Sequence, residues 1–220
     1  MRQVAISFAG EVLHLCGSGA LWWPARRLLC VSDLHLGKSE RIARRGGTML
    51  PPYDTAETLG RLGDVIGHYA PKTVICLGDS FDDLAAADAL AEPARLSLAA
   101  MQAGRDWIWI EGNHDAGPVE LGGSHRDEVG VGPLTFRHIA EAGAAGEITG
   151  HYHPKARIAL SGRAVARACF ALDARRLILP AFGAYTGGLW TSDPAISALF
   201  GEGAKVVLTG PHPLLFPMPR

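Results

Sequence analysis

The sequence has no bias that would assign it to a membrane or a strongly charged class of protein. Its 21 basic and 22 acidic residues give a formal net charge of -1, so any contact with nucleic acid must be confined to a local patch. No apolar run reaches the roughly 18 residues needed to cross a bilayer. The first residues also lack the apolar stretch and cleavage site of a signal peptide. We therefore expect a soluble, cytoplasmic protein.

Cysteine is scarce and never closely paired. Four cysteines stand singly at positions 16, 30, 76 and 169, which argues against a zinc ribbon and against a Cys-x-x-Cys redox motif. Cys30 and Cys76 lie in apolar runs and are interpreted as small core residues. This usage is typical of a protein kept under reducing conditions.

The composition otherwise indicates a packed globular chain. Hydrophobic residues make up 48% and charged residues 20% of 220 positions, far from the signature of disorder. We predict one domain over residues 1–220, with strands within residues 1–27 that include a hairpin over 4–15, and an irregular proline-rich tail over 211–220.

Four short apolar runs end abruptly in polar residues, as strands do where they meet a loop. The runs are residues 28–31, 73–77, 107–110 and 147–149. Between the first two, Asp54 and Glu57 have the spacing of a capping box and begin a predicted helix, and residues 94–103 predict another. The first half is therefore βαβ-like.

Short apolar runs without helical spacing dominate the second half and predict largely antiparallel strands. They are residues 134–137, 156–160, 165–172, 176–179 and 205–209. Trp107 and Trp109 alternate along the third run above, which suggests a core strand rather than a surface for stacking bases. No stretch interleaves aromatic and basic residues as a single-strand stacking platform would.

The polar residues after these runs are competent to bind metal ions. Asp33 and His35 are two positions apart, and Asp79 follows Gly78, whose small size allows a close approach. Each pattern alone occurs in ordinary turns. A carboxylate such as that of Asp79 can bridge two cations, so together they suggest a metal site.

The later motifs are more informative. Asn113 offers a neutral oxygen, His114 an imidazole, and Asp115 a carboxylate that could orient that imidazole. His151 and His153 place two imidazoles on one loop. These motifs, in this order and each after an apolar run, favour a functional interpretation over a structural one.

His138 follows the predicted strand over residues 134–137 and is a further candidate ligand. A partly buried structural histidine is the alternative at this position. Mixed oxygen and nitrogen donors without a thiolate point to Mn²⁺, Fe²⁺ or Zn²⁺. Two such ions about 3.5–4 Å apart would activate a bridging hydroxide for in-line attack on phosphorus. His114 could then protonate the leaving oxygen.

Taken together, these motifs resemble the calcineurin-like metallophosphoesterase superfamily over residues 28–154. The resemblance implies an α/β fold, a four-layer α/β/β/α sandwich of two mixed sheets flanked by helices. It implies two divalent ions, with manganese the leading candidate. One ion would take Asp33, His35, Asp79 and His153; the other would take Asp79, Asn113, His138 and His151. It also implies that His114, with Asp115 behind it, is the catalytic acid.

A narrower resemblance is to the bacterial DNA ligase-associated metallophosphoesterases, which are described as DNA damage response endonucleases. It is carried by residues 22–24, 33–38, 50–55 and 146–154. The sequence departs from that group at Asp82, where a histidine is expected. The resemblance implies a phosphodiesterase or endonuclease acting on DNA in repair, associated with a DNA ligase and other repair factors.

Substrate contacts are less well specified. Lys38, Arg41, Arg44 and Arg45 could grip phosphates that flank the scissile bond, and a solvated basic face is the alternative. A phosphatase or phosphodiesterase acting on a nucleotide or phosphoprotein would share every metal ligand. A non-catalytic scaffold on the same fold is a third hypothesis, and the presence of His114 disfavours it.

Overall fold

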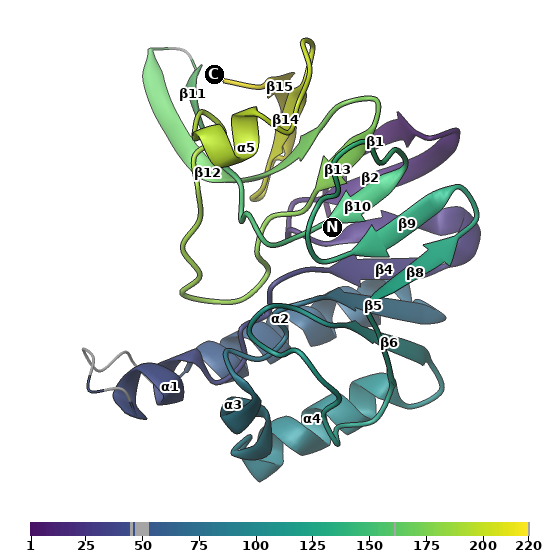
Figure 1. Ribbon diagram of the computed structural model, residues 1–220, viewed down its shortest axis with the longest axis vertical. Coiled ribbons are helices and arrows are strands. Elements are labelled where there is room, and N and C mark those ends of the chain that lie inside the picture. The colour runs from purple at the N-terminus through teal and green to yellow at the C-terminus, as the bar shows by residue number, and fades with distance from the viewer. Residues whose placement is uncertain (45, 47–52, 161, 220) are drawn as a thin grey trace.

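The chain forms two β-sheets packed face to face, with helices on their outer sides (Figure 1). The computed structural model describes residues 1–44, 46, 53–160 and 162–219. The first sheet contains, in spatial order, β1 (Gln3–Phe8), β2 (Glu11–Cys16), β3 (Leu21–Trp23), β4 (Leu28–Val31), β5 (Thr73–Leu77), β6 (Asp106–Ile110) and β7 (Ser124–Arg126). Neighbours are antiparallel from β1 to β4 and parallel from β4 to β7, so this sheet is mixed.

The second sheet is also mixed. Its spatial order is β15 (Leu214–Pro217), β14 (Lys205–Leu208), β12 (Arg163–Leu172), β13 (Arg176–Ile178), β10 (Glu147–Thr149), β9 (Leu134–Arg137) and β8 (Glu128–Val131). Strand β10 runs parallel to β9 and β13, and the other pairs are antiparallel. Strand β11 (Lys155–Leu160) pairs with β12 as a two-stranded ribbon, and a single bridge joins its Lys155 to Trp190.

Side-chain alternation explains the layers. In β4, Leu28 and Cys30 point into the core between the two sheets, whereas Leu29 and Val31 point toward the helices. The same two-residue period recurs in β5 and β6. These strands are therefore buried on both faces, as parallel strands covered by helices must be.

Helices α2 (Asp54–Tyr69) and α4 (Glu92–Gln102) cover the outer face of the first sheet, with α1 (Lys38–Arg44) and α3 (Leu84–Asp88) beside them (Figure 1). The short helix α5 (Pro194–Ser197) packs on the outer face of the second sheet through Ile196. A 3-10 turn, η1 (Pro24–Arg26), links β3 to β4. The predicted four-layer α/β/β/α order is confirmed. No helix in the described ranges has the length and apolarity of a membrane span.

The predicted capping box at the start of α2 is wrong. Tyr53 is the N-cap and its side chain forms no capping hydrogen bond. Asp54 is instead a buried helical residue whose carboxylate accepts hydrogen bonds from the N–H and hydroxyl of Ser39. Because Ser39 belongs to α1, this carboxylate joins the first two helices rather than capping one of them.

The expectation of an irregular tail is also wrong. Leu214 to Pro217 form β15, which pairs with β14 at the edge of the second sheet. An edge strand tolerates proline because its outward N–H groups need no partner in the sheet. The short strands β7 and β8 were likewise not predicted, whereas β1 to β3 fall within the predicted strand region 1–27. The strand positions predicted for β4, β5, β6 and β10 agree with the structure to within one residue.

Candidate metal centre

All seven candidate ligands follow strands whose carboxyl ends open toward the same region. They are Asp33 and His35 after β4, Asp79 after β5, Asn113 after β6, His138 after β9, and His151 and His153 after β10. Strands β4 to β6 are parallel neighbours in one sheet, and β9 and β10 are parallel neighbours in the other. Loops at the carboxyl ends of parallel strands are where α/β sheets bind ligands.

Six of the seven ligand side chains form two groups within which the ligand atoms lie no more than 4.8 Å apart. One group is Asp33, His35 and His153, and the other is Asp79, His138 and His151. Asn113 joins the second group because its Oδ1 lies 3.1 Å from His138 Nε2. Such spacing allows each group to surround one cation, with Asp33 and Asp79 as the anionic donors.

Two imidazoles are held with one nitrogen fixed and the other facing the centre. His35 Nδ1 lies 2.8 Å from Asp82 Oδ1, and His35 Nε2 is buried with no hydrogen-bond partner among the described residues. His138 Nδ1 donates to the Leu77 carbonyl at 3.0 Å. This leaves its Nε2 facing the Asp79 carboxylate at 3.4 Å. Metal-binding histidines are commonly oriented in this way.

The charge of the centre also suits a cation. Burial alone would raise the pKa of Asp79, but its hydrogen bond and proximity to His138 hold that pKa below its ordinary value. Burial alone would lower the pKa of His138, and the neighbouring Asp79 and Asp33 carboxylates raise it instead. Positive charge is therefore favoured between these groups, so the donor set fits divalent cations.

Five of the seven candidate ligands have left-handed backbone conformations. The φ angles are 52° at Asp33, 45° at His35, 44° at Asp79, 70° at His151 and 47° at His153. This conformation costs a non-glycine residue about 1–2 kcal/mol. Strain of this kind persists where the surrounding structure fixes it, and it collects at functional sites. The strained turns bring the side chains of loops far apart in the sequence toward one another.

Two motif glycines allow the loops to pack this closely. A Cβ atom at Gly78 would overlap the imidazole of His138, and one at Gly150 would overlap the hydroxyl of Ser32. The predicted need for a small residue before Asp79 is thus explained by His138. Ser32 in turn donates a hydrogen bond to Asp33 Oδ2, which helps to orient that carboxylate.

The structure differs from the sequence-based expectation for Asp115. Its carboxylate accepts hydrogen bonds from the backbone N–H groups of Asp79, Ser80, Phe81 and Gly112, at 2.7–3.1 Å, instead of contacting the His114 imidazole. Burial raises the pKa of Asp115, although these N–H groups oppose the rise. Asp115 therefore holds the Asp79 loop in shape, and an orienting role toward His114 is not what the structure shows.

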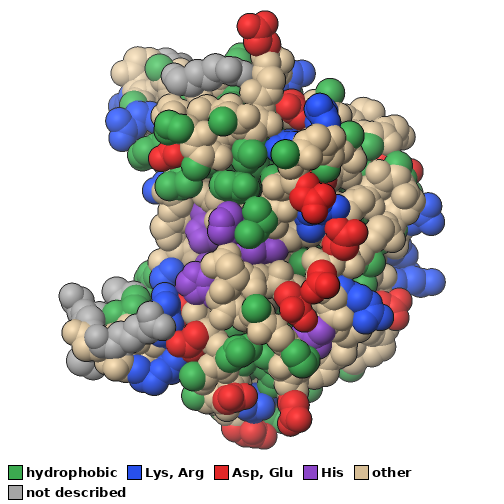
Figure 2. Space-filling model, in the orientation of Figure 1, with side chains coloured by type: hydrophobic (Ala, Val, Ile, Leu, Met, Phe, Trp, Pro, Cys, Tyr) green, Lys and Arg blue, Asp and Glu red, His purple; other side chains and the backbone are tan. Residues whose placement is uncertain are grey.

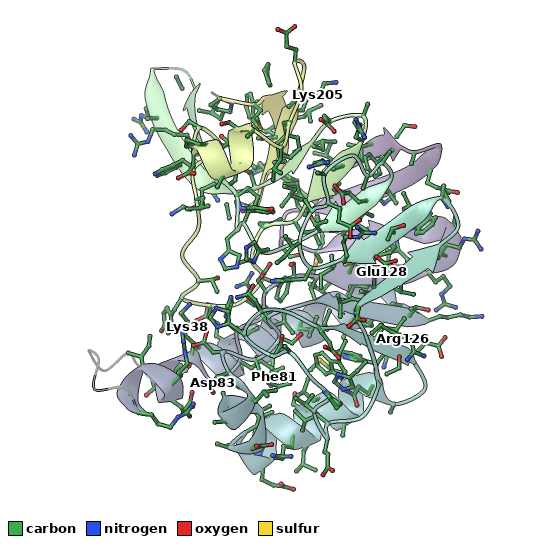
Figure 3. All side chains as sticks on the ribbon, in the orientation of Figure 1. Lys38, Phe81, Asp83, Arg126, Glu128 and Lys205 are labelled. Atoms are coloured by element: carbon green, nitrogen blue, oxygen red, sulfur yellow. The ribbon has the colours of Figure 1, made fainter. Side chains whose placement is uncertain are left out.

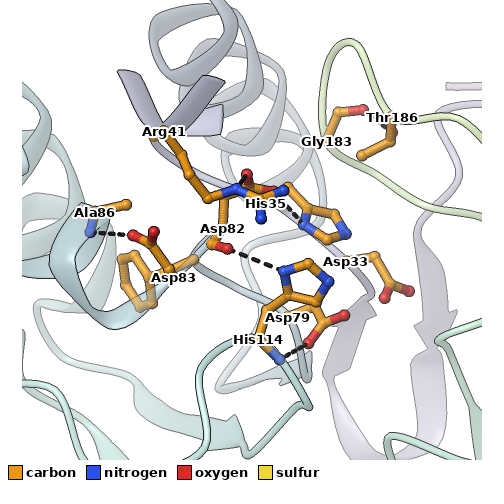
Figure 4. Close-up of polar contacts among 12 residues, drawn as sticks. Asp33, His35, Arg41, Asp79, Asp82, Asp83, Ala86, His114, Gly183 and Thr186 are labelled. Atoms are coloured by element: carbon orange, nitrogen blue, oxygen red, sulfur yellow. Dashed lines mark hydrogen bonds and ion pairs between the residues drawn. The ribbon is translucent and has the colours of Figure 1, made fainter. Parts of the chain in front are cut away.

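His114 is held in place by two hydrogen bonds, one to a backbone carbonyl and one to a carboxylate. Its Nδ1 donates to the carbonyl of Asp82 at 2.9 Å, and its backbone N–H donates to Asp79 Oδ1 at 2.9 Å (Figure 4). The half-buried ring lines a cavity of about 410 Å³ together with His35, His151 and His153. The other ring nitrogen, Nε2, is thus the one available to a ligand in that cavity.

Only part of the predicted basic cluster reaches the cavity. Lys38 and Arg41 line it, and Arg41 also pairs with the buried carboxylate of Asp82. Arg44 instead forms an ion pair with Asp83, with 2.8 Å between Arg44 Nη2 and Asp83 Oδ1. Neither Arg44 nor Asp83 is among the residues that line the cavity. Arg45 lies outside the described residues. The expectation that Arg44 grips a phosphate beside the centre therefore has no support from its position.

The two sides of the centre differ in charge. Lys38 and Arg41 face one side, whereas the hollow on the other side, beside Asn113 and His138, has four acidic residues and one arginine in its wall. Those five are Glu111, Asp127, Glu128, Glu141 and Arg137. An anionic substrate is therefore expected to approach from the side of Lys38 and Arg41.

Two features of the site were not predicted: the contacts of Asp82 and the loop that carries Gly188 and Leu189. Asp82 contacts His35 and Arg41, which are 47 and 41 residues away in the sequence. Gly188 and Leu189 line the cavity from a loop that carries no motif. The departure from the family pattern at Asp82 was the one available sequence signal for this residue. The loop of Gly188 carried none, because its placement depends on tertiary packing.

Comparison with known proteins agrees with this geometry. A family model for the calcineurin-like phosphoesterases matches residues 26–158. The crystal structure of Pseudomonas putida nuclease MPE is similar at 30% sequence identity and a TM-score of 0.76, covering 97% of this chain and 100% of that one. A search of curated proteins found no match. With five strained, converging ligands and a family match over more than half of its length, this chain belongs to the calcineurin-like phosphoesterase family.

Proposed function

We propose that the protein is a phosphodiesterase that uses two divalent metal ions to cleave DNA, acting as an endonuclease in DNA repair. In this proposal one ion is held by Asp33, His35, Asp79 and His153, and the other by Asp79, Asn113, His138 and His151. The observation that carries the proposal is the pair of converging ligand groups, together with the buried Nε2 of His35, which has no hydrogen-bond partner in the described part of the chain. Manganese is the leading candidate, with Fe²⁺ and Zn²⁺ as alternatives.

Asp79 is the residue expected to contact both ions. In the structure its Oδ1 accepts the N–H of His114 and its Oδ2 faces His138. A carboxylate has enough lone pairs to accept such a hydrogen bond and still bind metal. Asp79→Asn should therefore remove more metal than His138→Ala, and equal metal content in the two variants would contradict the bridging role.

The chemistry divides between the ions and the side chains. Bound divalent ions would supply Lewis acidity, which lowers the pKa of water and offsets charge on the phosphoryl oxygens. His114 would hold a proton at Nε2 and deliver it to the leaving oxygen, because its Nδ1 is occupied by the Asp82 carbonyl. Lys38 and Arg41 would bind the phosphate oxygens from the open side of the cavity.

DNA is favoured over a nucleotide or a phosphoprotein by two observations. The similar Pseudomonas putida protein is named as a nuclease. The cavity also opens on the basic side of the centre, as a polyanion requires. A non-catalytic scaffold is disfavoured because His114 lies in the cavity with one nitrogen free to act. Association with a DNA ligase and cytoplasmic location remain part of the proposal.

A substrate panel would test this function. Chelated and Mn²⁺-reloaded protein should hydrolyse bis(p-nitrophenyl) phosphate and cut single-stranded or duplex DNA, and His114→Ala should lower the rate about 10²–10⁴-fold. His68→Ala is the matched control, because His68 is exposed on α2, remote from the ligand loops, and should keep the full rate. Hydrolysis of p-nitrophenyl phosphate alone would reject the nuclease proposal.

A further inference from the structure

Trp190 is the one tryptophan with substantial exposure. Its side chain is 38% exposed, whereas the four other tryptophans are at most 9% exposed. Two cations lie over its ring in cation–π contact: Lys155 Nζ is 5.0 Å and the Arg157 guanidinium carbon is 5.1 Å from the ring centroid. An exposed aromatic ring beside basic groups is the combination that holds the bases and phosphates of single-stranded nucleic acid.

The strand face that carries the two cations is exposed and bears otherwise small side chains. Lys155 and Arg157 alternate along β11 and so share one face of the β11–β12 ribbon. The other positions on this face are alanines, namely Ala159 on the same strand and Ala164, Ala166 and Ala168 directly opposite on β12. Such small side chains do not cover the two cations, which lie over the Trp190 ring.

Both cations are available to bind phosphate. Neither Lys155 nor Arg157 forms an ion pair with a carboxylate anywhere in the described part of the chain. The net charge of the protein is -1, so its surface is not basic as a whole. Two neighbouring cations without an acidic partner therefore form a local basic site.

This surface is continuous with the metal centre. The backbone of Lys155 donates to Leu189 and accepts from Thr191, which fixes Trp190 beside β11. Two neighbouring residues of the segment 187–192 therefore face two different hollows. Leu189 lines the cavity of the metal centre, and Trp190 lines a second hollow of about 240 Å³. Lys155 is two residues after the candidate ligand His153, so their Cα atoms are at most about 7 Å apart.

We propose that Trp190, Lys155 and Arg157 form an aromatic-basic platform that binds an unpaired nucleotide of the DNA strand, next to the phosphate being cleaved. Trp190 stacks on the base, and the two cations bind the flanking phosphates. The platform rests on the proposed function, because it names which form of DNA that centre takes. Figure 2 shows the histidines in a notch, and basic side chains border it on the lobe that carries this platform and on the side of α1.

Stacking selects a single strand over a duplex. A base in a duplex has its faces covered by its neighbours, whereas an unpaired base can place its face on an indole ring. Residues from two separate parts of the sequence build the platform, which is why no single stretch interleaves aromatic and basic residues.

Equilibrium binding of a fluorescein-labelled oligothymidylate of about 12 nucleotides would test the platform, in EDTA to prevent cleavage. Trp190→Ala should weaken binding roughly 5- to 100-fold, and Trp190→Phe should restore most of the loss because a ring remains. With an oligonucleotide lacking bases, wild type and Trp190→Ala should bind equally. A similar loss for a blunt duplex and for oligothymidylate would overturn the assignment to single strands.

Salt dependence tests the two cations separately. Arg157→Ala and Lys155→Ala should each lower the slope of log affinity against log salt by about 0.7, the value for one lost phosphate contact to a single strand. Arg126→Ala is the matched control, because Arg126 is exposed on β7, well separated from Lys38 (Figure 3). Its slope and its hydrolysis rate should equal those of wild type.

The outcomes separate the platform from the proposed function. Wild-type hydrolysis of bis(p-nitrophenyl) phosphate combined with unchanged oligothymidylate binding by Trp190→Ala would reject the platform and leave the phosphodiesterase standing. Failure of the wild type to hydrolyse any diester would reject the function itself. Unchanged salt slopes in both cation variants would also reject the platform, whatever the effect of Trp190→Ala.

Discussion

Replacing Asp82 by asparagine should weaken metal binding although Asp82 itself is not a proposed ligand. Its buried carboxylate contacts His35 Nδ1 at 2.8 Å and also pairs with Arg41. Burial alone would raise the pKa of Asp82, but His35 and Arg41 hold that pKa below its ordinary value, so the group is ionised. The carboxylate thereby fixes the proton of His35 on Nδ1. This leaves the lone pair of Nε2 free to bind a cation and makes Nε2 a stronger metal ligand.

The expected size of the effect follows from the loss of that charge. Asparagine has nearly the same shape but offers a neutral acceptor, and a charge-assisted hydrogen bond is roughly twice as strong as a neutral one. Loss of a group that orients a ligand typically costs 10- to 100-fold in metal affinity, which is about 1.4–2.8 kcal/mol. Arg41 would also lose its anionic partner and become free to move.

Calorimetric titration of the chelated protein with Mn²⁺ would measure this effect, with the Mn²⁺ dependence of diester hydrolysis as a second readout. Asp83→Asn is the matched control. Asp83 is the neighbouring carboxylate, it caps α3, and its pair with Arg44 is partly exposed. Asparagine caps helices as well as aspartate does, so Mn²⁺ affinity should be unchanged. If Asp82→Asn binds Mn²⁺ within threefold of wild type, the orienting role assigned to Asp82 is wrong.

Three other predictions concern the loops that hold the ligands and the buried core. Asp115→Ala should lower the free energy of unfolding by about 3–5 kcal/mol in urea titration, because buried N–H groups lose their acceptor; a loss below about 1 kcal/mol would contradict this. Gly150→Ala should cost about 1–3 kcal/mol by overlap with Ser32, whereas Gly67→Ala in α2, with open space around it, should not destabilise. Burial raises the pKa of Cys16 to about 11 and of Cys169 to about 12. Both thiols should therefore stay protonated and resist a thiol reagent at pH 8 until denaturant is added. Rapid labelling of these two cysteines in the folded protein would contradict this prediction.

The sequence predicted those parts of the molecule that local chemistry determines. The strands before Asp33, Asp79 and Asn113 were recognisable because a buried strand is a short apolar run, and a polar residue must follow where the chain leaves the sheet. The order of the two sheets came from the family resemblance. Edge strands such as β15 were missed because their half-exposed residues carry no strong pattern.

Contacts between distant loops could not be predicted in the same way. Asp115 looked like a partner for the adjacent His114, yet its carboxylate bonds the backbone of the Asp79 loop. Trp190 meets Lys155 only because the loop before α5 packs against β11. No periodicity or motif spacing in the sequence predicts either contact, because each depends on how separate elements pack together.

The most direct test of the central claim is a crystal structure of the Mn²⁺-loaded protein with anomalous scattering recorded at the manganese edge. The geometry predicts two peaks, one among Asp33, His35 and His153 and one among Asp79, His138 and His151. They should lie about 3.5–4 Å apart. A single peak, or peaks outside these two groups, would contradict the proposed two-metal centre.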